Sequence, residues 1–337
     1  MEVQEKLQNE VANCIECGLC TKNCSFLEKY DLNLADFSKR PDLAYNCFLC
    51  GDCERVCPED IDGRKIAIMM REDSVEKNGD KIAEDGYSIL LKEKINYKFK
   101  NYKSANSKVV LFTGCNFPSF YPGATSKISE ILKEYGIDTV YDCCGKPVSE
   151  LGLKKEAEKI IENINNELKK REVEEVVMLC PNCYYFLRNK IDAKVVSIYK
   201  KLDELNLGKK LDKDMKIFMP CPDKEARFIF KDIEKFLPNT DNLGDDDKKV
   251  EIIKAQCCGL GGCASAKESE LSAGFTNDAI KKGGDDFYVY CASCAGNFRR
   301  GGADNVLHIL NEILEIDEKP EKGIKSLTNR MKFKFKR

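Results

Sequence analysis

Tryptophan is absent from this chain of 337 residues, and histidine occurs only once, at His308. No stretch approaches the roughly 20 consecutive apolar residues that a membrane-spanning helix needs, so no membrane span is expected. The first residues are polar and acidic, unlike a secretory signal, and a cytoplasmic location is expected. The net charge is only −2 and the basic residues are scattered, so the composition gives no reason to expect a nucleic-acid partner.

Cysteine, in contrast, occurs 19 times. The number is odd and the chain is long, whereas secreted domains stabilised by disulfides are usually short. So many cysteines in a cytoplasmic chain indicate metal, either zinc held by four cysteines or iron–sulfur clusters. Because exposed thiolate-bound iron oxidises easily, we expect the host to be an anaerobe.

Two segments near the amino terminus share the spacing Cys-x2-Cys-x2-Cys-x3-Cys, and Pro58 follows the second. This is the spacing of bacterial ferredoxins, in which the fourth cysteine of each run binds the other cluster. The spacing therefore predicts two cubane 4Fe–4S clusters, one on Cys14, Cys17, Cys20 and Cys57 and the other on Cys47, Cys50, Cys53 and Cys24. Zinc knuckles are the alternative, but they rarely use three cysteines at intervals of three plus a fourth.

The residues around these runs are expected to be helical. The 22 residues between the runs, 25–46, carry spaced apolar side chains that suit a helical insert better than a short hairpin. Apolar periodicity also predicts helices over residues 64–77 and 82–95, and a short helix is expected over 5–12. The polar segment 96–107 marks a domain boundary.

A second arrangement of cysteines occurs twice further along the chain. Each copy has a single cysteine, then a Cys-Cys-Gly triplet, then a Cys-x-x-Cys pair. The first set consists of Cys115, Cys143, Cys144, Cys180 and Cys183, and the second consists of Cys221, Cys257, Cys258, Cys291 and Cys294. A cubane cluster needs four ligands, and adjacent cysteines point in different directions, so five thiolates indicate a cluster that is not a simple cube.

Each cysteine group is predicted to lie just beyond the carboxyl end of a strand. Strands are expected at 108–113, 138–141, 173–179, 216–219, 250–253 and 287–290, and helices at 123–135, 153–170, 224–236, 267–281 and 306–314. This alternation predicts mainly parallel sheets. The carboxyl edge of a parallel sheet is where ligands usually bind, which supports a metal role for both sets.

On these motifs the chain resembles the heterodisulfide reductase family. Thr113-Gly-Cys115, Cys143-Cys-Gly145, Cys180-Pro-Asn-Cys183 and Cys257-Cys-Gly-Leu-Gly-Gly262 are similar to signatures of its cysteine-rich catalytic subunit. The amino-terminal part resembles its small iron–sulfur subunit, as in fused forms of the two. The resemblance implies two noncubane 4Fe–4S clusters, with a disulfide cleaved between them, and it makes the ten cysteines of the two sets the catalytic residues. The family also includes iron–sulfur subunits of glycolate, lactate and glycerol-3-phosphate dehydrogenases, so the substrate does not follow.

The sequence departs from the family pattern at two places. Histidines usually surround the single cysteine of the second repeat, but none is present around Cys221. His308 is expected to be an ordinary helix residue, which leaves Asp223, Lys224 or solvent as proton sources. Cys263 stands where the family tends to have glycine, and a spare thiol is favoured over an extra ligand.

The predicted fold class is α+β and multidomain. An α-helical two-cluster ferredoxin domain (1–62) and a helical linker (63–104) precede two α/β cysteine-rich repeats with mainly parallel sheets, at 105–207 and 208–317. A basic tail (318–337) is expected to be a solvated terminus rather than a membrane or partner contact. The acidic run 245–247 is expected to be a loop.

Two functions are consistent with these features. The first is a reductase of a small disulfide, in which single electrons pass from the ferredoxin-type clusters to the repeat clusters. The alternative is a non-catalytic electron-transfer subunit of a flavin-dependent 2-hydroxy acid or glycerol-3-phosphate dehydrogenase complex. Electrons are expected from a partner subunit, namely a flavoprotein, a hydrogenase or a ferredoxin. No G-x-G-x-x-G loop precedes a helix, so any flavin is expected on that partner.

Overall fold

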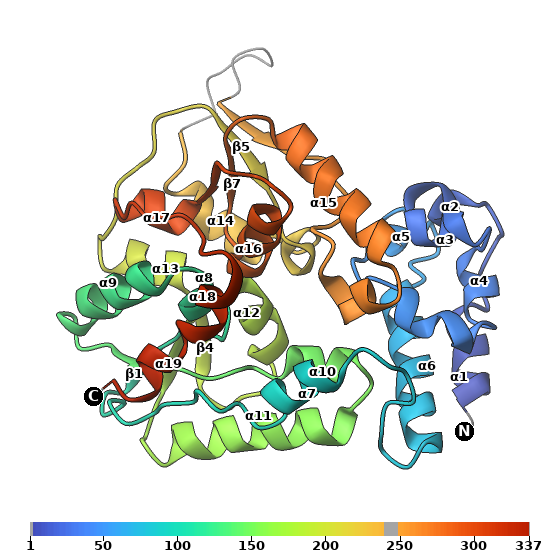
Figure 1. Ribbon diagram of the computed structural model, residues 1–337, viewed down its shortest axis with the longest axis horizontal. Helices are drawn as coiled ribbons and strands as arrows, with labels where there is room; N and C mark the ends of the chain where they lie inside the picture. Colours follow the sequence, from blue (N-terminus) through green and yellow to red (C-terminus); the bar gives the residue numbers. More distant parts are fainter. Residues whose placement is uncertain (1–2, 239–248, 337) are drawn as a thin grey trace. The chain divides into compact units, whose positions relative to one another are not determined.

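The computed structural model describes residues 3–238 and 249–336, which divide into two compact units (Figure 1). The first unit contains Met1–Asn96, Gly145–Glu158 and Gln256–Thr276, and the second contains Tyr97–Cys144, Lys159–Ala255 and Asn277–Arg337. A segment that begins at the glycine of the first Cys-Cys-Gly motif and a segment that contains the whole second motif thus belong to the same unit as the amino-terminal part of the chain. Within residues 3–238 and 249–336, no helix has both the length and the apolar character needed to cross a membrane.

The described part of the first unit consists of helices and loops and contains no strand, and the first residues of α11 (Lys154–Lys169) belong to it. Its elements are α1 (Val3–Glu10), α2 (Leu19–Asn23), α3 (Ser25–Lys29), α4 (Leu34–Phe37), η1 (Pro41–Asn46), α5 (Asp52–Arg55), α6 (Gly63–Lys77), α7 (Ser88–Lys94), α10 (Lys146–Glu150) and η4 (Gly261–Ala266). The start of α15 (Ser269–Gly283) also belongs to it. Asp62 caps α6 by accepting hydrogen bonds from the backbone N–H groups of Arg64 and Lys65. The helical insert and the helix at 64–77 are therefore confirmed, whereas the helix expected at 82–95 is reduced to α7.

The insert contributes the apolar core of this unit. Phe26 and Phe37 are almost fully buried, and their rings meet edge to face with centroids 5.2 Å apart. Ile66 and Met70, on the inner face of α6, lie in the same cluster of buried side chains. Several cysteines belong to this cluster too, so the core and the cysteine sites are built together.

The second unit contains two parallel four-stranded sheets. The first has the order β2-β1-β3-β4, from β1 (Val109–Phe112), β2 (Asp138–Val140), β3 (Glu175–Met178) and β4 (Lys194–Ser197). The second has the order β6-β5-β7-β8, from β5 (Met215–Phe218), β6 (Val250–Ile252), β7 (Phe287–Val289) and β8 (Val306–His308). The orders correspond strand for strand, so the repeat seen in the cysteine spacing is also a repeat of topology. The predicted parallel sheets are confirmed.

Helices connect these strands. They are α8 (Phe117–Phe120), α9 (Pro122–Lys133), α11 (Lys154–Lys169), α12 (Pro181–Leu187) and α13 (Ile198–Glu204) in the first repeat, and η2 (Cys221–Asp223), α14 (Phe228–Glu234), α15, α16 (Ala292–Arg300) and α17 (Ile309–Ile313) in the second. The helix expected at 224–236 begins only at Phe228. Strand β4 and helix α13 were not expected from the sequence.

The prediction of a helix at 306–314 is wrong for the first three residues. Residues 306–308 form strand β8, and only α17 is helical. The apolar spacing of Leu307, Leu310 and Leu314 is consistent with a helix. The open edge of β7, however, needs a partner for its backbone groups, and β8 supplies it. His308 therefore ends a strand rather than lying within a helix.

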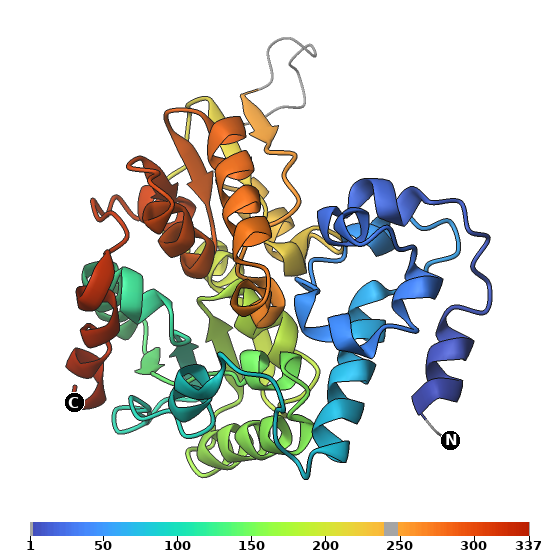
Figure 2. The ribbon, with the colours of Figure 1, turned by 45° about the vertical axis from the view of Figure 1, so that its right-hand side comes forward.

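The carboxyl-terminal segment is packed, so the expectation of a solvated tail is wrong. It forms α18 (Gly323–Thr328) and α19 (Met331–Lys334), and α18 lies against α8 (Figure 2). Phe333 is only 3% exposed and stacks on Tyr141, with ring centroids 5.0 Å apart. The Asn101 side chain donates hydrogen bonds of 2.8 Å to the backbone oxygens of Phe333 and Lys336. The acidic run 245–247 lies outside the described residues.

Candidate metal centres

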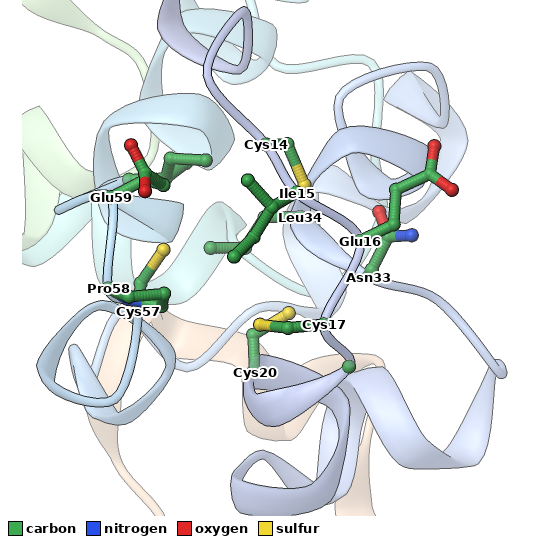
Figure 3. A pocket seen from close by; sticks show the side chains of 12 residues that line it. Cys14, Ile15, Glu16, Cys17, Cys20, Asn33, Leu34, Cys57, Pro58 and Glu59 are labelled. Carbon is green, nitrogen blue, oxygen red and sulfur yellow. The ribbon is translucent and has the colours of Figure 1, made fainter.

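The four cysteines assigned to one ferredoxin-type cluster line a single pocket in the first unit. Cys14, Cys17, Cys20 and Cys57 surround it, and Figure 3 shows the first three on one stretch of chain and Cys57 on another. Ile15, Leu34 and Ile61 complete an apolar lining, which would limit the access of water. Cys17 is exposed, so this site, which we call the outer site, lies near the surface.

The other four ferredoxin-type cysteines also come together, at what we call the inner site. Cys24, Cys47 and Cys50 all lie near enough to Cys53 to raise the pKa of its thiol, in addition to the larger effect of burial. Burial raises the pKa of Cys24 to about 11, and Cys47 adds to the rise. The ferredoxin-type spacing is thus matched by two groups of four thiols, with Cys24 and Cys57 exchanged between the runs.

The donor sets fit iron–sulfur clusters. Four thiols in a largely apolar setting are the ligands such clusters take, and because the bound form is the thiolate, metal loading must displace protons from Cys24 and its neighbours. Within residues 3–238 and 249–336, no three His, Cys, Asp or Glu side chains converge as ligands of a single metal ion.

A buried arginine lies beside the inner site. Arg71 is 0% exposed, and its guanidinium donates to four backbone oxygens, those of Ala44 (3.0 Å), Cys47 (2.8 Å), Glu150 (2.7 Å) and Gly262 (2.8 Å). Its charge acts to lower the pKa of Cys47, although burial has the larger, opposite effect. Burying a cation is costly unless a negative charge lies near it, and thiolates bound to a cluster would supply that charge.

The Gly-Gly step of the second Cys-Cys-Gly motif packs on the loop of the inner site. A Cβ atom on Gly261 would lie 2.1 Å from the backbone oxygen of Phe48. One on Gly262, whose φ is +59°, would lie 2.5 Å from that of Cys47. Only glycine permits so close an approach. Glu268, just beyond, is 1% exposed and accepts hydrogen bonds of 2.6 Å from Lys29, Tyr30 and Asn46.

The first five-cysteine set lies entirely in the second unit, beyond the carboxyl ends of β1, β2 and β3 as predicted. Cys144 and Cys180 lie close enough to Cys183 to raise the pKa of its thiol. A Cβ atom on Gly114 would lie 3.1 Å from the Cys183 sulfur, so the chain just before Cys115 passes close to it. Cys143, Cys144, Cys180 and Cys183 are buried, whereas Cys115 is half-buried and is the most accessible member.

The second set is divided between the units. Cys221, Cys291 and Cys294 belong to the second unit, beyond β5 and β7, and Cys257 and Cys258 belong to the first. Within the first unit, the backbone N–H of Gly259 donates a hydrogen bond to the Cys257 sulfur, with 3.2 Å between nitrogen and sulfur. All members are buried except the half-buried Cys221.

The Cys-x-x-Cys pairs of the two repeats meet inside the second unit. The side chains of Cys180 and Cys291 lie close enough to affect each other's pKa. Asn182 donates its side-chain N–H to the Cys291 sulfur over 3.5 Å, and Asn116 donates to Ser293 over 2.6 Å. Sulfur atoms from both repeats thus lie side by side, which the spacing of the motifs did not reveal.

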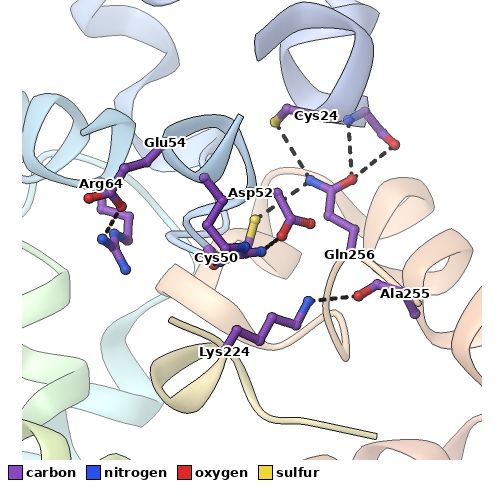
Figure 4. Close-up of polar contacts among 10 residues, drawn as sticks. Cys24, Cys50, Asp52, Glu54, Arg64, Lys224, Ala255 and Gln256 are labelled. Carbon is purple, nitrogen blue, oxygen red and sulfur yellow. Dashed lines mark hydrogen bonds and ion pairs between the residues drawn. The ribbon is translucent and has the colours of Figure 1, made fainter. Parts of the chain in front are cut away.

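Two of the proton sources considered from the sequence, Asp223 and Lys224, already form hydrogen bonds within the protein. Asp223 is 0% exposed, and its carboxylate accepts from the hydroxyls of Tyr185 and Tyr290 and from the backbone N–H groups of Ile229 and Phe230. Lys224 donates to the backbone oxygen of Ala255 over 2.7 Å (Figure 4). Asp223 anchors the loop that carries Cys221.

His308 is buried between aromatic rings. Its ring lies edge-on to Phe117 and Tyr121, with centroids 5.1 and 5.3 Å away, and Nδ1 accepts the Leu310 N–H. Burial lowers the pKa of His308 to about 4, so the imidazole is neutral at ordinary pH. A neutral, enclosed imidazole is a poor proton donor.

Cys263 lies in the first unit and packs, half-buried, against the core that contains the inner site. Burial raises the pKa of its thiol to about 11, and Glu150 adds to the rise. Its role as a spare thiol remains a prediction. The residues that the sequence reasoning missed are Arg71, Gln256 and Glu268. None belongs to a cysteine motif, and only the position of Gln256 beside Cys257 offered a signal.

Comparison with known proteins supports the assignments by motif. A model of the cysteine-rich domain called CCG matches residues 109–188 and 216–299, and a 4Fe-4S dicluster domain model matches residues 13–62. An uncharacterized iron–sulfur protein of Methanocaldococcus jannaschii is 26% identical over 309 residues, and one of Methanococcus maripaludis is 25% identical over 314 residues. A subunit of the fumarate reductase (CoM/CoB) of Methanothermobacter marburgensis is 23% identical over 310 residues.

These alignments cover only part of the length of each relative. Each covers 78% of this chain, which spans 61% of the length of each relative. A solved structure, aspartate racemase of Picrophilus torridus, aligns with 68% of this chain and 100% of its own at 9% identity and a TM-score of 0.33, which is too low to support an inference. One matched model is a 4Fe–4S dicluster domain and two of the relatives are named as iron–sulfur proteins, so the resemblance indicated by the motifs is confirmed. The chain therefore belongs to the heterodisulfide reductase-like family of iron–sulfur proteins, in which a 4Fe–4S dicluster domain is joined to CCG cysteine-rich domains.

Proposed function

We propose that this chain is a disulfide-reducing oxidoreductase subunit. It passes single electrons from two ferredoxin-type clusters to clusters on the cysteine-rich repeats, where a disulfide is reduced to two thiols. The observation that carries the proposal is the contact between Cys180 and Cys291, which brings sulfur ligands of both repeats together. A disulfide placed there would meet one cysteine of each five-cysteine set.

The cysteines would be divided among four clusters. The outer and inner sites would each hold a cubane 4Fe–4S cluster, and each five-cysteine set would hold a noncubane 4Fe–4S cluster. When bound, these clusters supply and accept electrons one at a time. Splitting the S–S bond takes two electrons and two protons and yields two thiols, so electrons must arrive in two steps.

The chain's own residues would perform three tasks. The buried thiolates hold the metal away from water, while the half-buried Cys115 and Cys221 mark where a substrate could approach. Asp223 holds the Cys221 loop in place through its four hydrogen bonds. Because Asp223 and Lys224 are engaged and His308 is enclosed, we infer that solvent supplies the two protons.

The electrons would come from a partner subunit. One relative is named as a subunit of a fumarate reductase (CoM/CoB), which supports a place in a multi-subunit reductase. A flavoprotein, a hydrogenase or a ferredoxin are the candidate donors, and the exposed Cys17 of the outer site marks the entry point. We expect the complex to be cytoplasmic and its substrate to be a small disulfide.

One observation favours a second function. No histidine is available to donate a proton beside the cysteine sets, since the single His308 is buried and neutral. The chain would then be a non-catalytic electron conduit for a flavin-dependent dehydrogenase of 2-hydroxy acids or glycerol 3-phosphate.

Iron analysis and spectroscopy test the proposal. Protein prepared without oxygen should contain about 16 iron atoms if four 4Fe–4S clusters form, and about 8 with zinc would contradict the proposal. Candidate thiols added to oxidised protein should produce a new paramagnetic signal. Cys291→Ser should abolish that signal, whereas the control Cys263→Ser should leave it unchanged. No signal, together with tight binding to a flavoprotein, would favour the electron conduit.

A further inference from the structure

The residue before the second Cys-Cys pair reaches the inner ferredoxin-type site. Gln256 belongs to the first unit and immediately precedes Cys257. Its Nε2 lies 3.6 Å from the sulfur of Cys24 and 3.6 Å from the sulfur of Cys50, as Figure 4 shows. Its Oε1 accepts two hydrogen bonds from Ser25, from the backbone N–H at 3.2 Å and from the hydroxyl at 3.1 Å.

These four contacts match the donors and acceptors of the amide. An amide NH2 group has two hydrogens, one for each sulfur, and the oxygen has two lone pairs, one for each donor of Ser25. In the flipped orientation the oxygen would face two sulfurs and the NH2 group would face a backbone N–H. Because metal-bound thiolates carry no proton to donate, the flipped orientation would lose the bonds to both sulfurs and to the Ser25 backbone N–H, and would keep only a bond to the Ser25 hydroxyl, which can also accept. Ser25 therefore directs the N–H groups toward the sulfurs.

Hydrogen bonds to cluster sulfurs are a known determinant of cluster potential. Reduction makes a cluster more negative, so an N–H donor stabilises the reduced form more than the oxidised form and raises the potential. Burial has the opposite effect because it disfavours added charge. Cys24, Cys50 and Cys53 are 6%, 5% and 6% exposed, so an inner-site cluster would be hard to reduce without such donors.

Gln256 also connects two cysteine groups. Its side chain touches Cys24 and Cys50, and its backbone is joined by one peptide bond to Cys257, all within the first unit. A short path of one hydrogen bond and a few covalent bonds thus runs from the inner site to Cys257.

We propose that Gln256 is a positioning residue that raises the potential of the inner-site cluster and links this cluster to the set containing Cys257. The role as a link rests on the proposed function, whereas the effect on potential does not. Electrons from the outer site would then move to an inner site whose potential Gln256 keeps high enough to receive them.

Redox titration of the full chain tests this. Gln256→Leu removes both donors, and Gln256→Glu also places a negative charge beside the sulfurs. The equilibrium constant for reduction of one ferredoxin-type cluster should be about threefold to tenfold lower in Gln256→Leu and lower still in Gln256→Glu. A tenfold change corresponds to 59 mV for one electron. Gln8→Leu, at an exposed position of the same unit, should change nothing. Repeating the comparison in a Cys17→Ser background, which lacks a ligand of the outer site, assigns the shift to the inner one.

Equal potentials in wild type and both Gln256 variants, at equal iron content, would overturn the proposal. If Gln256→Leu and Gln256→Glu fail to hold iron, Gln256→Asn decides, because it keeps an amide but its shorter side chain withdraws the N–H donors from both sulfurs. A fall in the same potential supports the proposal, and an unchanged potential overturns it. The titration needs no disulfide substrate, so its result is independent of the test by thiol-induced signal.

Discussion

Replacement of Arg71 by methionine tests how the two sequence segments beyond the Cys-Cys-Gly motifs are attached to the ferredoxin-type sites. The Arg71 side chain binds backbone oxygens of Cys47, in the inner-site loop, and of Glu150 and Gly262, in the later segments. Methionine fills much of the same apolar space but donates no hydrogen bond. The variant therefore removes the links and leaves four buried backbone oxygens, including that of Ala44, without their donor.

The magnitude follows from these four bonds. A buried acceptor left without its partner costs about 1 kcal/mol at the lower end of the observed range, which gives about 4 kcal/mol for four. Loss of the positive charge beside a negatively charged cluster would add to this. If the whole effect falls on opening of the first unit, about 4 kcal/mol corresponds to roughly a thousandfold faster opening.

The assay is the rate of iron release in a fixed concentration of urea without oxygen, because a cluster-bound protein does not unfold in a simple two-state way. Arg71→Met should release iron from the ferredoxin-type sites at least tenfold faster than wild type. Arg71→Lys, which keeps the charge but cannot reach four oxygens, should be intermediate. Lys77→Met on the same helix breaks an exposed pair with Asp73 and should change stability by less than about 0.5 kcal/mol. An Arg71→Met rate within twofold of wild type would refute the reasoning.

Three further predictions use variants or conditions with internal controls. Gly261→Ala should destabilise the first unit by about 2 kcal/mol or more, because its Cβ would lie 2.1 Å from a backbone oxygen. The control Gly274→Ala, where nothing lies within 4 Å of the added Cβ, should be neutral or stabilising. Equal denaturation midpoints of the two variants would contradict this. Phe333→Ala should lower the free energy of unfolding by about 3 kcal/mol. Phe335→Ala, at a side chain that is 70% exposed, should lower it by less than about 0.5 kcal/mol. Equal losses would mean that the tail is not packed. The pKa of His308 is lowered to about 4 in the folded protein, so its contribution to stability is present above pH 6.5 and is lost as the pH falls toward 4. Between pH 7 and pH 5 wild type should lose about 2 kcal/mol more than His308→Leu in urea titrations, and parallel pH profiles would show that the imidazole is accessible.

Local patterns in the sequence were sufficient wherever neighbouring residues determine the geometry. Three cysteines at intervals of three and a fourth before Pro58 predict two groups of four thiols, and the structure places the cysteines in those groups. Apolar runs followed by cysteines predict strands whose carboxyl ends carry the five-cysteine sets, and the two parallel sheets have this arrangement. Periodicity failed at residues 306–308, where pairing with an open sheet edge outweighed a helical pattern.

Contacts between distant parts of the chain were decided only by the tertiary structure. Gln256 is 232 residues from Cys24, and Arg71 is 191 residues from Gly262, so no local pattern could join them. The tail reads as polar and basic, yet burial of Phe333 against Tyr141 packs it onto the second unit. The sequence by itself determined which atoms can bind metal, because that depends on residue type and short spacing. Which charges and amide groups surround those atoms depends on how remote segments pack, and only the folded chain settles it.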